Sequence, residues 1–234
     1  MAFLTRRLVE RVSLFLSFGG LVTTFVTTFL PLWKTLNSDL NEMENWYEGL
    51  WHMCIFTEEL GLHCKAYESI LALPPDKLAS RVLMFISIAT GLLGVFAAFF
   101  GLEGVLDGSG SGGGGGGGAQ RRRKLKRGLL IAGGVLIWIS GLTTLTPVSL
   151  VAYYTVVEFW DENVPDVVPR WEFGEAMFSG WIAGLILVVG GSFLFVAVCM
   201  GDCEVEKAEE VQALSLALSK DTARTRPYLK TEVL

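Results

Sequence analysis

Two cysteines and two histidines lie within a short stretch of this sequence, at His52, Cys54, His63 and Cys64. Side chains of these types bind zinc, and each histidine lies close to one cysteine. Zinc sites usually space paired ligands about two to four residues apart, whereas the interval from Cys54 to Cys64 is much wider. We therefore favour a disulfide, which requires an oxidising compartment. Closing so short a loop would contribute about 2–4 kcal/mol of stability.

Catalytic patterns do not occur in this sequence. It contains no Cys-x-x-Cys, no His-Glu-x-x-His and no Gly-x-Ser-x-Gly. Its long apolar runs hold no ionisable side chain of the kind that marks a proton relay or a transport site. Threonines within these runs are expected to bond across helices or back to the backbone rather than to line a pathway. We expect a protein that is not an enzyme, has no cofactor or metal, and does not bind nucleic acid.

Four apolar runs determine the class of protein. The chain has 234 residues, of which 51% are hydrophobic and 18% charged, whereas soluble domains carry about 25% charged residues. About 20 apolar residues in a helix cross a hydrocarbon core of about 30 Å. Each uncharged run is at least that long, so the sequence predicts four transmembrane helices, the first of them uncleaved because it is too long for a signal peptide. The runs are 12–33, 82–102, 128–157 and 176–201.

Lysine and arginine near the ends of the spans predict the orientation. Arg6, Arg7 and Arg11 precede the first span, and six basic residues lie within 121–127. That basic run either serves as a topology signal alone or also binds anionic membrane lipid. The loop 34–81 has eight acidic residues against four basic ones, and the last loop is also mostly acidic. Both termini and the middle loop are therefore predicted to be cytoplasmic.

The predicted segments follow from these assignments. They are a cytoplasmic amino end (1–11), a first span (12–33), an extracellular loop (34–81), a second span (82–102), a cytoplasmic loop (103–127), a third span (128–149), a second extracellular loop (150–175), a fourth span (176–200) and a cytoplasmic tail (201–234).

The composition of the loops and tail indicates how they fold. Loop 34–81 is rich in aromatic residues and turn formers, which favours short strands, with one short helix near 74–79. The segment 147–157 either projects above the membrane or tilts within it. The glycine-rich run 108–118 is typical of a flexible coil, and 204–220 is compatible with a surface helix. Two cysteines at the end of the last span are candidates for palmitoylation, or are inert thiols, namely Cys199 and Cys203.

A set of residues in the first loop resembles the signature of the claudins, the four-span proteins of tight junctions. The set is Trp33, Gly49-Leu50-Trp51, Cys54, Cys64 and Arg81. This signature alone is shared with relatives of peripheral myelin protein and with calcium-channel gamma subunits. The second loop adds a claudin-like pattern in Glu158-Phe159-Trp160, Pro165 and Arg170-Trp171-Glu172-Phe173-Gly174. Segments 41–46 and 159–166 are most similar to the claudin twenty-two and twenty-four branch.

The resemblance implies an all-α membrane protein, a left-handed four-helix bundle capped by a small antiparallel extracellular β-sheet. It also implies a plasma-membrane protein of tight junctions that associates with itself and other claudins, both side by side and between cells. Three features depart from the family. The glycine run is not expected of a claudin, no cysteine lies at the cytoplasmic end of the second span, and the second loop lacks the Asn-Pro-Leu-Val-like segment of members that bind a clostridial toxin.

The resemblance also assigns roles to individual side chains. Lys65, directly after the second cysteine, lies near the paracellular ion path, where Glu48 and Glu68 would offset its charge if they point the same way. We therefore expect a barrier with at most a weak anion preference. Phe159 and Trp160 are candidates for adhesion between cells, or else pack on the first loop.

The last three residues of the chain are candidates for binding a partner. Glu232, Val233 and Leu234 are candidates for binding a PDZ scaffold, because an apolar last residue with a free carboxylate can add as a strand to a PDZ groove. The alternative to a junction protein is a non-junctional regulatory subunit of a channel or receptor, which would use the same sheet to bind a partner.

Overall fold

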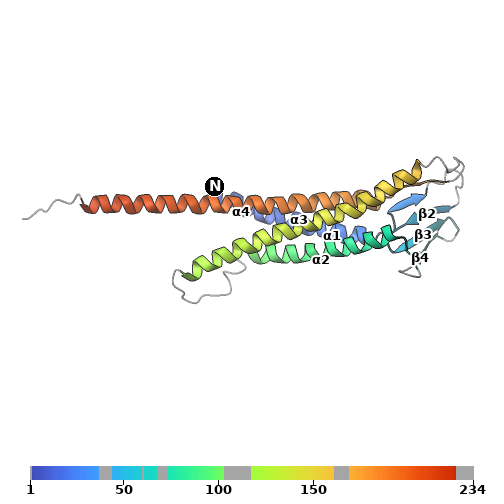
Figure 1. Cartoon of the computed structure of the whole chain (residues 1–234), viewed down its shortest axis with the longest axis horizontal. Coiled ribbons are helices and arrows are strands. Elements are labelled where there is room, and N and C mark those ends of the chain that lie inside the picture. The colour runs from blue at the N-terminus through green and yellow to red at the C-terminus, as the bar shows by residue number, and fades with distance from the viewer. Residues whose placement is uncertain are drawn as a thin grey trace, which may run out of the picture.

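The computed structural model describes residues 2–36, 44–59, 61–67, 73–102, 117–160 and 169–224. Four helices lie along one another as an elongated bundle, and a small sheet lies at one end of it (Figure 1). The helices are α1 (Ala2–Phe29), α2 (Pro75–Gly101), α3 (Gly117–Phe159) and α4 (Glu175–Arg224). All four are long and apolar enough to cross a membrane. The predicted fold class, a four-helix membrane bundle with a small sheet, is confirmed.

The helices have different bounds from the apolar runs that predicted them. The fixed φ of Pro75 suits the first turn of α2, and Asp76 in that turn is favourable at the positive end of the helix dipole. The short helix expected near 74–79 is therefore the beginning of α2. The tail segment 204–220 is the continuation of the 50-residue helix α4 and not a separate surface helix. Helix α3 continues through Pro147 for 43 residues in all.

Each helix packs on its neighbours in chain order, and α4 also packs on α1, which closes the ring. Small residues allow close approach, since a Cβ on Gly180 would lie 2.7 Å from a methyl of Val148 and one on Gly184 would lie 2.6 Å from Leu145 Cγ. Hydroxyl groups join the helices as well, because Ser87 of α2 contacts the Thr144 hydroxyl of α3 at 2.6 Å. These are the contacts that stabilise helix association where water is excluded.

The threonines of the spans behave as expected from the sequence. Thr27 bonds across to Ser179 at 2.8 Å. The others donate to a carbonyl oxygen one turn earlier on the same helix; they are Thr23, Thr24, Thr28, Thr143, Thr144 and Thr146. Their hydroxyl groups are therefore occupied and do not provide the polar lining that a transport pathway needs.

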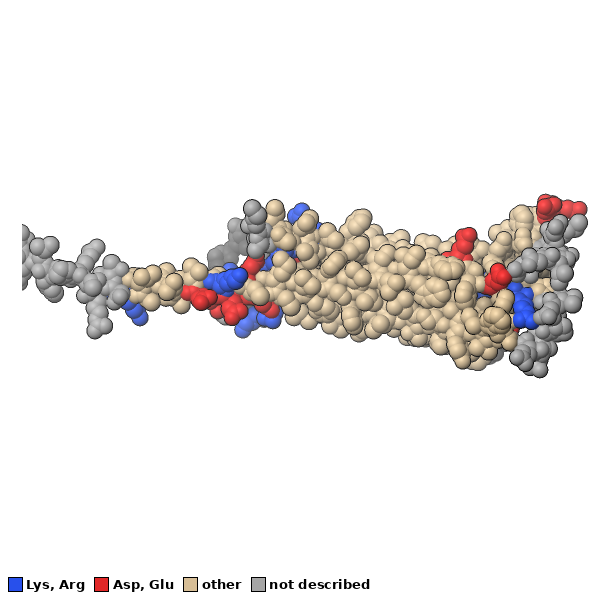
Figure 2. Space-filling model, turned by 90° about the horizontal axis from the view of Figure 1, so that it is seen from above, with Lys and Arg blue, Asp and Glu red and all other residues tan. Residues whose placement is uncertain are grey.

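The surface of the bundle is divided by charge. Lysine, arginine and acidic side chains gather toward the two ends, and the long middle of the visible face is uncharged (Figure 2). Large apolar side chains are exposed along that middle part, Phe15, Leu93 and Leu142 among them. A surface of this kind is stable in contact with lipid hydrocarbon and not with water.

Both long loops contribute to a single sheet. The strands are β1 (Lys34–Leu36), β2 (Glu44–Glu48), β3 (His52–Thr57), β4 (Gly61–Ala66) and β5 (Trp171–Phe173). Their order is β4-β3-β2-β1-β5, and every pair is antiparallel. The short strands expected in the first loop are present, and β5 from the second loop adds to the edge at β1.

Candidate functional site: the sheet and its contacts with the bundle

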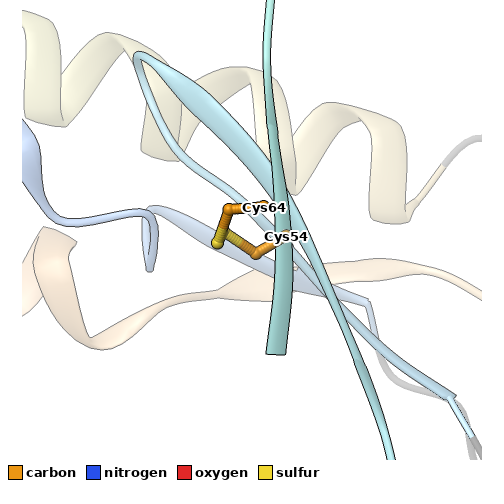
Figure 3. The surroundings of a disulfide bond; sticks show 2 residues. All are labelled: Cys54 and Cys64. Carbon is orange, nitrogen blue, oxygen red and sulfur yellow. A yellow bond between two sulfur atoms is a disulfide. The ribbon is translucent and has the colours of Figure 1, made fainter. Parts of the chain in front are cut away.

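A disulfide joins the two central cysteines of the first loop. Cys54 on β3 and Cys64 on β4 are directly opposite in the hairpin, with their Cα atoms 4.0 Å apart, and their sulfur atoms are bonded (Figure 3). His52 lies on the same face of the hairpin as Cys54, whereas His63 lies on the other face, because side chains alternate along a strand. The two histidines and the two cysteines therefore do not converge on one point, and the predicted disulfide is present.

Trp33 connects the sheet to the helix bundle. Its side chain is 2% exposed and packs with Leu50 from the turn between β2 and β3 and with Met84 and Met177 from the helices. The indole N–H donates to the carbonyl oxygen of Thr27 at 2.9 Å, so the polar atom of this buried ring is satisfied. The sheet is therefore fixed to the bundle by a common core and not only by its connecting chains.

Two glycines allow the chain between α1 and β1 to pass close to its neighbours. A Cβ on Gly49 would lie 2.5 Å from the Cα atom of Pro31, and one on Gly174 would lie 2.0 Å from the carbonyl oxygen of Leu32. Both distances are too short for any real Cβ, so a side chain at either position would displace the backbone. The Gly174 N–H donates to the Trp33 carbonyl at 2.9 Å, which holds the second loop against the first.

Arg81 of α2 binds the turn between β2 and β3. Its Nε–H donates to the carbonyl oxygen of Leu50 at 2.7 Å, and its guanidinium lies 4.5 Å from the centre of the Trp51 ring. The side chain is buried, and Trp51 continues the contact to Phe85 of α2 at 5.5 Å between ring centres. A planar cation that both donates and stacks requires arginine, which explains why this residue type belongs to the signature.

Glu48 forms a packed ion pair instead of projecting from the sheet. Its carboxylate, which is 12% exposed, binds the ammonium of Lys77 in α2. The Tyr67 hydroxyl donates to the same carboxylate at 3.4 Å, and the Lys77 ammonium lies 5.1 Å from the centre of the Tyr67 ring. Burial raises the pKa of the Tyr67 hydroxyl, and the Glu48 charge raises it further. Glu48 therefore fixes β2 to α2, and Lys77 compensates its charge.

Lys65 lies on the exposed edge strand β4. The register places Lys65 opposite Met53, and Met53 opposite Glu48, so Lys65 and Glu48 project from the same face. Two strand spacings of about 4.8 Å separate them, which is more than the screening length of about 8 Å at physiological salt. Glu68, the third candidate for the ion path, lies outside the described residues.

The end of α3 forms an aromatic pocket with β5. Phe159 and Trp160 contact each other edge to face at 5.6 Å, and Trp160 is 73% exposed. The Arg170 guanidinium donates to the Phe159 carbonyl and lies 5.6 Å from the centre of its ring. A cavity of about 380 Å³ lies between these rings and the strand β5. The two adhesion candidates therefore lie next to the strand that the second loop itself supplies.

The opposite end of the bundle holds the remaining candidates. Cys199 and Cys203 are both exposed thiols on α4. Two ion pairs join α4 to its neighbours near them, Arg127–Asp202 at 2.8 Å and Arg6–Glu204 at 3.8 Å. The PDZ candidates Glu232, Val233 and Leu234 lie outside the described residues, as does most of the glycine run.

The comparison with known proteins identifies the family. Residues 11–194 match the model of the PMP-22/EMP/MP20/Claudin family. The chain belongs to this family. Mouse claudin-8 is 31% identical over 194 residues, which cover 82% of this chain and 81% of claudin-8. Human claudin-19 is 33% identical over 183 residues, which cover 77% and 76%, and rat claudin-1 is 31% identical over 178 residues, which cover 75% and 79%.

These similarities confirm the claudin resemblance seen in the sequence. The family match at 11–194 includes both loops and three spans and reaches into the fourth span. The assignment to the claudin twenty-two and twenty-four branch stays a prediction.

Two residues of this claudin that help to fix Glu48 of the sheet to α2 were not predicted from the sequence, namely Tyr67 and Lys77. Lys77 lies four residues before Arg81 and therefore on the same face of α2. That spacing could have indicated that Lys77 faces the sheet as Arg81 does. Nothing in the sequence indicates the ion pair between Lys34 and Glu158, because 124 residues separate the two.

Proposed function

We propose that this chain is a structural component of tight junctions that holds neighbouring cells together and controls what passes between them. The observation that carries the proposal is the single sheet built from both long loops of a claudin, closed by Cys54–Cys64 and fixed to the bundle through Trp33 and Arg81. A rigid sheet at the end of a membrane bundle can form a defined wall between cells, which two mobile loops could not do. The protein acts as a structural element and not as an enzyme.

The proposed orientation places the sheet outside the cell and both termini in the cytoplasm. Arg6, Arg7 and Arg11 on α1 and the basic run 121–127 on α3 lie at the end of the bundle opposite the sheet. Basic residues at the ends of spans favour the cytoplasmic side. The disulfide at the sheet end supports the same orientation, because such bonds persist in oxidising compartments.

The proposed selectivity rests on Lys65. A unit charge 4 Å from a passing ion is worth about 4 kcal/mol at an effective dielectric constant near 20. Glu48 contributes little against it, because Lys77 binds its carboxylate inside the fold. A barrier that disfavours cations, with at most a weak preference for anions, follows from this arrangement.

Other partners are part of the same proposal. Phe159 and Trp160 would contact a claudin on the facing cell, with the pocket beside β5 receiving an apolar side chain. Glu232, Val233 and Leu234 would bind a PDZ scaffold, and Cys199 and Cys203 would carry acyl chains, for which their exposure on α4 provides access.

Expression of the tagged full chain in fibroblasts without junctions tests the proposed function. Enrichment at cell contacts, with intramembrane strands in freeze-fracture replicas, is the expected result. A diffuse surface distribution without strands would contradict it and would favour the alternative of a non-junctional regulatory subunit. The variant Gly174→Leu tests whether the sheet is needed, because its side chain would displace the Leu32 backbone and should reduce strand formation.

A further inference from the structure

A long apolar groove lies between α1 and α2 on the outside of the bundle. The groove is open to the outside and has a volume of about 540 Å³. Phe15 and Phe18 of α1 and Phe96 and Phe99 of α2 form its walls, Leu21 lies at its inner end, and Arg11 lies at its outer end. The phenyl rings are strongly exposed, with Phe15 at 78% and Phe96 at 58%.

The groove results from the way in which the two helices meet. A Cβ on Gly91 would lie 2.7 Å from a methyl of Leu21, so α1 and α2 approach closely at this level. Of the four neighbouring helix pairs, α1 and α2 share the least contact. The space from Leu21 toward Arg11 is therefore open to the hydrocarbon that surrounds the bundle, because an exposed apolar surface of this kind faces lipid and not water.

The depth of the groove matches one leaflet of a membrane. Ten residues of α1 separate Arg11 from Leu21, which corresponds to about 15 Å at about 1.5 Å per residue. Half of a hydrocarbon core of about 30 Å has the same depth. Arg11 is the last charged residue before the uncharged run of α1, so its guanidinium lies where lipid headgroups begin and Leu21 lies near the middle of the bilayer.

Arg11 supplies a charge that selects among lipids. Within the described part of the chain, no carboxylate pairs with its guanidinium. Guanidinium groups bind phosphate through two parallel hydrogen bonds. We propose that the groove binds one anionic glycerophospholipid of the leaflet at the Arg11 end, with an acyl chain between the four phenyl rings and the headgroup on Arg11. The acyl chain fits the shape of the apolar groove, and the negative charge of the headgroup makes Arg11 prefer anionic over neutral lipids.

The test compares lipid retention by the full chain and its variants. The protein is purified from bilayers of equal parts phosphatidylserine and phosphatidylcholine, and retained lipid is counted by native mass spectrometry. The wild type should retain phosphatidylserine in preference. Arg11→Gln should lower that preference about fivefold, as expected for the loss of about 1 kcal/mol per basic side chain. The matched control Arg121→Gln removes an exposed arginine of α3 outside the groove, so it should lower the preference less than Arg11→Gln does, and an equal loss in both variants would contradict a specific site at Arg11.

A second measurement locates the lipid. Phosphatidylserine with a photoreactive acyl chain should crosslink mainly to peptides containing residues 15–21 and 92–99. Equal labelling of all four helices would overturn the proposal, as would an unchanged preference in Arg11→Gln. Efficient disulfide crosslinking of two copies through Phe15→Cys in the same bilayers would also overturn it, because the groove would then hold a second chain.

Discussion

Lys34 and Glu158 join the two long loops of this claudin through an ion pair. The Lys34 Nζ and Glu158 Oε2 atoms are 3.0 Å apart, and the lysine side chain is 10% exposed whereas the glutamate side chain is 57% exposed. The pair links β1 to the end of α3. β1 also pairs with β5. The second loop therefore holds β1 in two ways, through this ion pair and through the backbone hydrogen bonds of β5.

The unequal burial of this pair predicts unequal effects of its two single variants. Glu158→Ala leaves the buried ammonium without its partner, which should cost about 1–3 kcal/mol. Lys34→Met leaves only a glutamate that water can solvate, so its cost should be about 1 kcal/mol or less. Apparent melting temperatures of the purified variants measure the difference. Equal losses for the two variants would show that the lysine is solvated after all.

The close approach at Gly49 predicts intolerance of any side chain there. Gly49→Ala should cost about 1–3 kcal/mol, because the new Cβ forces the backbone of Pro31 to move. The matched control is Gly19→Ala on α1, where nothing lies within 4 Å of the added Cβ. Thermal unfolding and the fraction reaching the cell surface report the effect, and similar values for the two variants would contradict the prediction.

The disulfide predicts a specific response to reductant. Reduction of the wild type should lower its stability by about 2–4 kcal/mol. A variant with Cys54→Ser and Cys64→Ser should be destabilised by a similar amount and should no longer respond to reductant. A variant with Cys199→Ser and Cys203→Ser should respond as the wild type does, since both of those thiols are free. The measurement is apparent melting temperature with and without dithiothreitol.

The contacts of Arg81 predict that lysine cannot replace it. An ammonium cannot both donate to the Leu50 carbonyl and stack over the Trp51 ring as the guanidinium does. Arg81→Lys should therefore lose about 1–3 kcal/mol, whereas Arg121→Lys at an exposed site should be neutral within about 0.5 kcal/mol. If the apparent melting temperature of Arg81→Lys equals that of the wild type, a positive charge alone is sufficient at this position.

The position of Lys65 on the exposed edge strand predicts its effect on ion permeability. Lys65→Glu in an epithelial layer should raise the ratio of sodium to chloride permeability in dilution potentials. Glu58→Lys, a charge change of equal size and opposite sign at the exposed β3–β4 turn, serves as the control and should have a smaller effect. A permeability ratio that does not change in Lys65→Glu would remove this side chain from the ion path.

The sequence allowed the helices to be predicted better than the contacts between loops. The four uncharged runs require spans, and the wide spacing of Cys54 and Cys64 in a loop predicted to face the oxidising side favoured a disulfide over a zinc site. The pairing of β5 with β1 was not predicted, because three residues are too few to show alternation and the partners are distant in sequence. The role of Glu48 also depends on register, since its charge is visible in sequence but its partner Lys77 is not.

The unbroken helix α4 has a mechanical consequence. Side chains from 205 to 220 are all exposed, so this part of α4 extends beyond the bundle (Figure 1). At about 1.5 Å per residue it is a rod about 24 Å long. Because the same helix passes through the bundle and begins at the sheet, tilting the sheet end moves the far end as a lever does. A protein that bound the exposed side chains of this rod would therefore lie away from the end of the bundle and would move with the sheet end of the same helix.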